Sequence, residues 1–211
     1  MGIGALGDIE RLLKRISGLS IGIITGDFSR IHDLVKTARE MELNITIIGK
    51  DEVMDKDFDC ILLDDPESVP ADKIRSSNIV EMLDDTESSL QRALAAGMGA
   101  FNPERLVAGI DPGKRPGVAF IADGRLISIY KSSSPKAAVK RVFLMKEAVK
   151  PQHSLVRLGD GDPSNRDRTL KYLYQTDIPV EMVDESMTTT ARKYRDEVAA
   201  IAIALTPGNP T

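Results

Sequence analysis

Residues 107–130 read VAGIDPGKRPGVAFIADGRLISIY and contain three strand-like segments in close succession. The first segment ends at Asp111, and the basic loop that follows contains Gly113 and leads to Gly117. The turn Asp123-Gly124 separates the second segment from the third, which is typical of a β-hairpin. A carboxylate at a strand end beside such a loop can hold a metal, lie near a phosphate or cap a turn. The remainder of the chain has to distinguish these roles.

The second half of the chain continues this hairpin with alternating helices and strands. Its periodicity predicts strands over 105–111, 117–123, 126–132, 153–160 and 178–184, and helices over 134–150, 164–175 and 189–205. An antiparallel hairpin set followed by crossover helices predicts a mixed five-stranded sheet with flanking helices.

The first half has a different pattern, in which single strands alternate with helices. Strands are predicted over 20–25, 44–49, 57–65 and 78–83, with helices over 8–16, 29–43 and 86–99, and Ser29 is the expected N-cap of the second helix. This order indicates a small α/β domain with a mainly parallel sheet. The glycines and proline of residues 97–104 mark a linker, so the predicted domains are 1–100 and 104–211.

Charge is distributed unevenly between the two halves of the 211-residue chain. Residues 1–103 carry 11 basic and 19 acidic side chains, whereas residues 104–211 carry 17 basic and 13 acidic ones. An excess of basic residues in one half is a hint of nucleic-acid contact. The chain has no apolar run near the ~18 residues of a membrane span, no secretory signal and a lone Cys60. We therefore expect a cytoplasmic protein without a membrane partner.

Acidic residues fall at the ends of several predicted elements in the second half. Parallel strands bring their carboxyl ends to one edge of the sheet, and a helix packed on the sheet can add a further acid. Gathered carboxylates suit Mg²⁺ or Mn²⁺, and two such ions ~3.5–4 Å apart can promote phosphodiester cleavage. Each acid taken alone could instead cap a turn or a helix. The candidate catalytic and metal-binding residues are Asp111, Asp160, Asp184 and Asp196, with Asp162 and Glu185 as alternates.

Three segments carry a resemblance to a known family. IDPGKRPGVAFI, VDESMTT and RDEVAAIAIAL resemble, in the same order, motifs of the RuvC/YqgF branch of the ribonuclease-H-like superfamily, which includes Holliday-junction resolvases. The resemblance covers most of 105–206. It implies a ribonuclease-H-like fold, metal-binding roles for Asp111, Asp184 and Asp196, and cleavage of structured DNA, such as four-way junctions, or of RNA.

The chain also departs from that family pattern. Ser186 stands where the family has arginine, and Asp160 is the nearest match to an acid that is usually glutamate. The domain formed by residues 1–100 has no counterpart in the resemblance, and its partner is unknown.

Basic residues of the second half are candidates for contact with a nucleic-acid backbone. Lys114, Arg115 and Arg166 are expected near phosphates, while Gly113 and Gly117 are expected to permit a tight loop and close phosphate approach. Further cations either follow phosphates or form an ordinary solvated face: Lys136, Lys140, Arg141, Lys146, Lys150, Arg168 and Lys171. Tyr172 and Tyr174 are expected to pack against the protein.

Three functions remain open from the sequence. The first is a metal-dependent endonuclease, expected to be a homodimer because a four-way junction is two-fold symmetric. The second is a non-catalytic nucleic-acid-binding or regulatory module on the same fold. The third is an ATP-binding protein related to actin-like or sugar-kinase-like ATPases.

Overall fold

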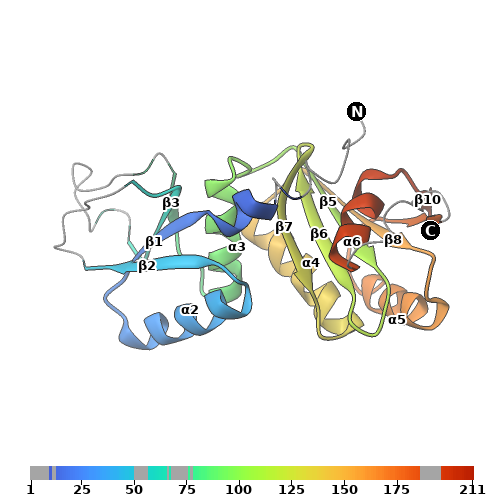
Figure 1. Cartoon of the computed structure of the whole chain (residues 1–211), viewed down its shortest axis with the longest axis horizontal. Helices are drawn as coiled ribbons and strands as arrows, with labels where there is room; N and C mark the ends of the chain where they lie inside the picture. The colour runs from blue at the N-terminus through green and yellow to red at the C-terminus, as the bar shows by residue number, and fades with distance from the viewer. Residues whose placement is uncertain are drawn as a thin grey trace. The chain divides into compact units, whose positions relative to one another are not determined.

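The chain divides into two compact units, residues 1–101 (unit 1) and 102–211 (unit 2), each described separately here (Figure 1). The structure is a computed structural model that describes residues 10, 13–49, 57–65, 67, 76, 78–185 and 196–211, with only the backbone of 196–197. Within these ranges no helix is long and apolar enough to cross a membrane.

Unit 1 contains a four-stranded, fully parallel sheet, which confirms the α/β prediction for this half. Its strands run in the order β2-β1-β3-β4. The elements are β1 (Ser20–Ile24), α2 (Phe28–Glu40), β2 (Asn44–Ile48), β3 (Cys60–Leu63), β4 (Ile79–Glu81) and α3 (Thr86–Gly97).

Buried β-branched residues explain the central position of β1, in which Ile21 and Ile23 are completely buried. The helix that follows is capped by Asp27, whose carboxylate accepts hydrogen bonds from the N–H groups of Ser29 and Arg30. The prediction of Ser29 as N-cap was therefore wrong by two residues. Both Asp and Ser suit an N-cap, and the helix begins where the earlier of the two candidates stands.

Unit 2 contains a mixed six-stranded sheet in the order β10-β9-β8-β5-β6-β7. Its strands are β5 (Arg105–Asp111), β6 (Gly117–Ala122), β7 (Arg125–Lys131), β8 (His153–Gly159), β9 (Val180–Val183) and β10 (Asn209–Pro210). β5, β8 and β9 are parallel neighbours, while β6 is antiparallel to both β5 and β7. The sheet has six strands, not the expected five, because β10 pairs antiparallel with β9. β10 is only two residues long.

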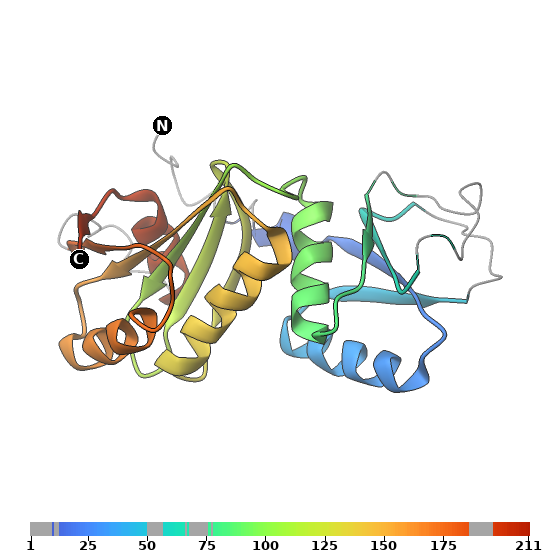
Figure 2. The same ribbon diagram turned by 180° about the vertical axis from the view of Figure 1, so that it is seen from behind.

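Three helices cover this sheet: α4 (Pro135–Val149), α5 (Pro163–Leu173) and α6 (Asp196–Leu205). α4 and α5 lie on one face and α6 on the other, as Figures 1 and 2 show. The predicted order of strands and helices up to α6 is thus confirmed. A glycine admits α6 closely, because a Cβ on Gly109 would approach Ala204 Cβ to 2.6 Å.

The hairpin between β6 and β7 turns at Asp123 and Gly124, which have φ values of 46° and 78°. Two successive positive φ angles are the mark of a type I′ turn, whose twist matches that of paired strands. The Asp123 carboxylate also accepts hydrogen bonds from the N–H groups of Glu104 and Arg105. Asp123 is therefore a structural residue that joins the hairpin turn to the start of β5.

Candidate functional site: the carboxyl edge of the second sheet

Three acids predicted from the sequence lie at one edge of the sheet in unit 2. Asp111 ends β5, whereas Asp160 and Asp184 directly follow β8 and β9. The register pairs Ile110 with Leu158 and Gly159 with Val183, so the three strands end at nearly the same level. The prediction that this edge collects acidic residues is confirmed for Asp111, Asp160 and Asp184.

The direction of each side chain follows from the pleat of the strands. Arg157 donates to Glu181 Oε2 at 2.8 Å and to the carbonyl of Ala204 in α6 at 2.8 Å, so Arg157 and Glu181 lie on the α6 face. Gly109, the register partner of Arg157, also faces α6. Two residues further along its strand, Asp111 shares this face.

Glu185, an alternate in the sequence analysis, is the acid of the β9 end that reaches the same face. Its Oε1 occupies the space of a Cβ on Gly159, and Gly159 lies beside Asp111 on the next strand. Glu185 Oε1 therefore lies over β8, the strand between β9 and β5, on the face that Asp111 shares. Asp184 is exposed and is one residue out of phase with this face.

Asp160 and Glu185 hold each other through backbone groups. Asp160 Oδ1 accepts a hydrogen bond from the Glu185 N–H at 2.9 Å, and Glu185 Oε1 accepts one from the Gly161 N–H at 2.9 Å. The Glu185 residue is buried, while Asp160 is exposed. We call these two reciprocal bonds the Asp160–Glu185 clasp. Its geometry makes Asp160 a positioning residue for Glu185.

Asp162, the other alternate, has a structural role at the start of α5. Its carboxylate accepts hydrogen bonds from the Asn165 side chain at 2.7 Å and from the Asn165 N–H at 3.1 Å. The Asn165 side chain, together with neighbouring N–H groups, lowers the pKa of Asp162. Helix capping of this kind accounts for Asp162 without a metal.

The loop after β5 presents its two cations to solvent. Lys114 and Arg115 are exposed, which suits contact with an anionic ligand. Gly113 has no positive φ, and a Cβ there would meet only the Arg115 nitrogen at 4.0 Å, so the backbone does not make the tight turn expected at this glycine. Gly117 is buried and begins β6 opposite Asp111.

Arg166 lies near the same edge through α5. Its Nη1 donates to the Asp160 carbonyl at 3.4 Å, and its guanidinium pairs with Asp167 at 2.8 Å. The cation is therefore partly neutralised by an exposed carboxylate, which a phosphate would have to displace.

The last predicted ligand, Asp196, begins α6, and its side chain lies outside the described residues, as do residues 186–195. Within the described ranges, no group of three or more His, Cys, Asp or Glu residues is placed to hold a metal ion. The described residues thus place two acids, Asp111 and Glu185, on one face of the carboxyl edge, with Asp160 bonded to the Glu185 N–H.

The corresponding edge of unit 1 is occupied by an internal ion pair. Asp64, just beyond β3, accepts hydrogen bonds from the Thr25 hydroxyl and from Arg30 Nη1, the latter at 2.9 Å. Arg30 also donates to the Leu83 carbonyl at 2.6 Å. These bonds tie together the ends of β1, β3 and β4 and the start of α2. The loop that leads from β1 into α2, residues 25–29 (TGDFS), therefore has a clear structural function.

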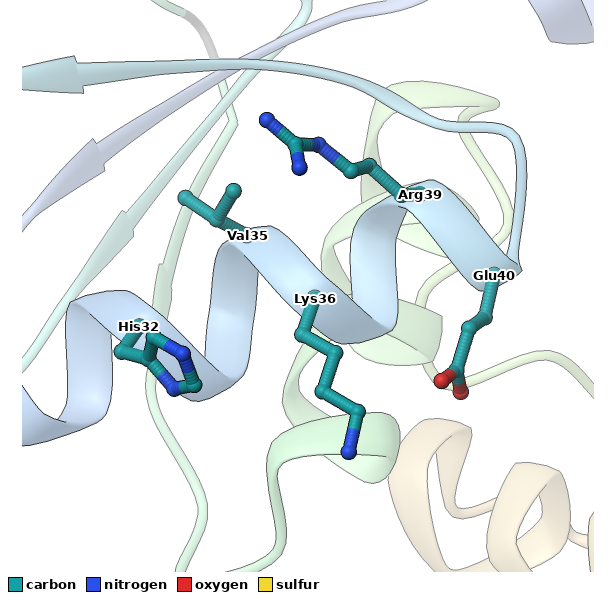
Figure 3. Close-up of a pocket in the computed structure, with 5 residues that line it drawn as sticks. All are labelled: His32, Val35, Lys36, Arg39 and Glu40. Atoms are coloured by element: carbon teal, nitrogen blue, oxygen red, sulfur yellow. The ribbon is translucent and has the colours of Figure 1, made fainter.

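A hollow elsewhere on unit 1 is lined by residues of a single helix, α2: His32, Val35, Lys36, Arg39 and Glu40 (Figure 3). The Lys36 and Arg39 side chains point away from each other in this view. Because the polar groups do not converge, the hollow lacks the geometry of a catalytic site.

Comparison of the chain with protein-family models, with curated proteins and with solved structures finds no match. Functional assignment therefore depends on the residues themselves and on the geometry of the carboxyl edge.

Proposed function

We propose that the protein is a metal-dependent endonuclease of the resolvase type, acting on structured DNA, such as four-way junctions, or on structured RNA. The observation that carries the proposal is the placement of Asp111 and Glu185 on one face at the ends of parallel strands. Carboxylates that share one face of a sheet edge repel each other, and a divalent cation relieves the repulsion.

The arrangement of elements supports the same proposal. Three strands in a hairpin series, followed by helix and strand in alternation, agree with the ribonuclease-H-like fold that the sequence motifs resemble. In this assignment, the strand end at Asp111 is the centre of the site. The acid from the β9 end is Glu185 in place of Asp184.

The donor set fits a hard divalent ion, because it consists of carboxylate oxygens. Asp111, Glu185 and Asp196 would hold Mg²⁺ or Mn²⁺. When bound, such an ion activates a water and stabilises the leaving oxygen of a phosphodiester.

The remaining residues of the site act by positioning and by charge. Asp160 and Gly161 orient Glu185 through the clasp. Lys114 and Arg115 contact phosphates of the nucleic-acid backbone from the exposed loop after β5. Arg166 contributes after its pairing with Asp167 is broken.

A second candidate, a non-catalytic nucleic-acid-binding module, is favoured by one specific observation. Asp160 and Asp162 both accept backbone N–H hydrogen bonds, so two acids that resemble ligands have structural roles. In this alternative Glu185 also serves only to join the ends of β8 and β9.

The test is cleavage of a labelled panel with Mg²⁺ or Mn²⁺: four-way DNA junction, linear duplex, single strand and structured RNA. We expect cleavage by the wild type and none by Asp111→Asn, with Asp162→Asn as a matched exposed-acid control that retains activity. Binding without cleavage in every lane would instead support the second candidate. Equal cleavage by wild type and Asp111→Asn would contradict the proposed site.

A further inference from the structure

α4 and α5 form a two-helix layer on the sheet face opposite α6 (Figure 2). α4 links β7 to β8, and α5 links β8 to β9; since these strands are parallel to one another, both helices run in the same direction. The two helices pack against each other. Lys146 of α4 also bonds to Asp177, which follows α5; its Nζ donates to the two carboxylate oxygens at 2.8 and 2.9 Å.

Each helix presents an exposed aromatic ring preceded by a lysine. Phe143 is 44% exposed and Tyr174, at the C-cap of α5, is 64% exposed. Lys140 and Lys171 each lie three residues before a ring, a spacing that places both side chains on the same side of a helix. The expectation that Tyr174 packs against the protein is therefore wrong.

An ion pair also links the two helices. Lys146 follows Phe143 by three residues, and its partner Asp177 follows Tyr174 by three residues. Because α4 and α5 pack against each other, both rings belong to one layer of helices.

Exposed cations surround the rings. We define the two-ring surface by its exposed basic and aromatic members: Lys136, Lys140, Phe143, Lys150, Arg168, Lys171 and Tyr174. None of its five cations forms a salt bridge within the described part of the chain. The exposed acids of the same helices, Glu147 and Asp167, are fewer, and Asp167 pairs with Arg166.

We propose that the two-ring surface binds single-stranded nucleic acid. Bases stack on Phe143 and Tyr174, and the neighbouring lysines attract the phosphates between them. Charge complementarity selects a polyanion, and the exposed rings favour a single strand because a duplex keeps its base faces stacked inside.

This inference deepens the proposed function, on which it rests for nucleic acid as the substrate class, but it involves different residues. α4 and α5, which carry the two-ring surface, lie on the sheet face opposite α6, whereas Asp111 and Glu185 lie on the α6 face. Both helices begin at the carboxyl edge, where Arg166 donates to the Asp160 carbonyl, so a strand can pass along α5 toward the site. Binding at the rings requires no metal.

The test is fluorescence anisotropy of the full chain with a labelled 15-nucleotide thymidine single strand, at low salt and with EDTA. For the double variant Phe143→Ala/Tyr174→Ala we expect the Kd to rise about thirtyfold. Phe28→Ala removes a ring that is 87% exposed on unit 1 and should leave the Kd unchanged. Phe143→Trp/Tyr174→Trp should restore tight binding, and circular dichroism checks that each variant is folded.

Further arms separate this inference from the endonuclease proposal. Asp111→Asn should bind the single strand as the wild type does, and a duplex of equal length should be insensitive to loss of the rings. No single-strand binding by the wild type, or equal binding by Phe143→Ala/Tyr174→Ala, overturns the two-ring surface even if cleavage is observed. Ring-dependent binding without any cleavage supports the surface and contradicts the nuclease.

Discussion

The carboxyl edges of the two sheets in this protein hold their acidic residues through different hydrogen-bond partners. In unit 1, Asp64 lies between the Thr25 hydroxyl and the Arg30 guanidinium, which neutralises it. In unit 2, Asp160 Oδ1 and Glu185 Oε1 each accept a hydrogen bond from a backbone N–H group. A further acid, Asp111, lies on the same face as Glu185.

This difference separates a structural edge from a candidate catalytic one. An acid paired with arginine joins strand ends and has little reason to bind a cation. Carboxylates oriented by backbone groups keep their charge and add to each other's field, which favours a cation at that position. The same topological location therefore carries different hydrogen-bond partners in the two units: a guanidinium and a hydroxyl at Asp64, and backbone N–H groups at Asp160 and Glu185.

Substitution of one acid at each edge should produce the largest difference, in cleavage activity and in stability. Asp111→Asn should reduce cleavage more than ~100-fold, beyond the effect typical of residues that only support a metal ligand. Asp64→Asn should leave cleavage unchanged and lower the free energy of unfolding by about 1 kcal/mol through its partly buried ion pair. Cleavage assays and urea denaturation of both variants measure this contrast, and similar losses of activity in both would remove the distinction between the edges.

Substitutions of Gly159 and of Gly113, two glycines near the carboxyl edge of unit 2, should have unequal effects on stability. A Cβ on Gly159 would overlap Glu185 Oε1 and approach Ile203 Cδ1 to 2.9 Å, whereas Gly113 has open space. Gly159→Ala should lower the free energy of unfolding by about 1–3 kcal/mol, with the movement of Glu185 also reducing metal affinity. Gly113→Ala is the matched control and should be close to neutral. Denaturation curves for the pair test the packing, and a Gly159→Ala variant as stable as Gly113→Ala would argue against it.

Substitutions of Asp160 and of Asp162 should have different effects on Mn²⁺ affinity, although the two positions are only two residues apart. Asp160→Asn weakens the clasp and should reduce Mn²⁺ affinity about tenfold, as expected for a residue that orients a ligand. Asp162→Asn keeps a residue that caps helices well and should change neither affinity nor stability appreciably. Calorimetric Mn²⁺ titration distinguishes the two. Equal losses would mean that the carboxylate at each position acts by charge alone.

The smallest expected effect concerns the ion pair between Arg157 of β8 and Glu181 of β9. Burial opposes ionisation of Glu181, but hydrogen bonds from Arg157 and Gly208 outweigh it, so the pKa of Glu181 is lowered. A lowered pKa in the folded state stabilises the protein above the ordinary pKa of glutamate, and this contribution is lost as the pH falls through the folded-state value. The stability difference between wild type and Glu181→Gln should be full at pH 7 and shrink below about pH 4.5. A pH-independent difference would exclude this linkage.

Much of the fold could be predicted because hydrophobic periodicity and turn residues are local signals. Strands 105–111 and 153–159 were located within one residue, and Asp123-Gly124 was recognised as a hairpin turn. β10 was missed because two residues are too few to show a period. The choice of Ser29 over Asp27 as a cap failed because both residues favour that position.

The faces on which the candidate acids lie could not be predicted from the sequence, since they depend on how one strand is registered against another. Asp184 and Glu185 are adjacent, and only the β8–β9 register and the side-chain positions show that Glu185 reaches Gly159, on the face that Asp111 shares. A usable signal was present: Arg157 and Glu181 are opposite charges inside two apolar strands, and pairing them would have identified the shared face. The glycines at 159 and 161 would then have indicated room for the glutamate.

The central claim is that Asp111 and Glu185 together hold the metal ion, and Mn²⁺ affinity of matched variants tests it most directly. Asp111→Asn, Glu185→Gln and the double variant would be compared with Asp184→Asn, which removes an exposed acid of the same charge one residue away. We predict that each single change at 111 or 185 weakens Mn²⁺ binding and that Asp184→Asn binds as the wild type does. The double variant should lose no more binding free energy than the two single variants lose together. Loss of binding in Asp184→Asn with retention in Glu185→Gln would contradict the claim.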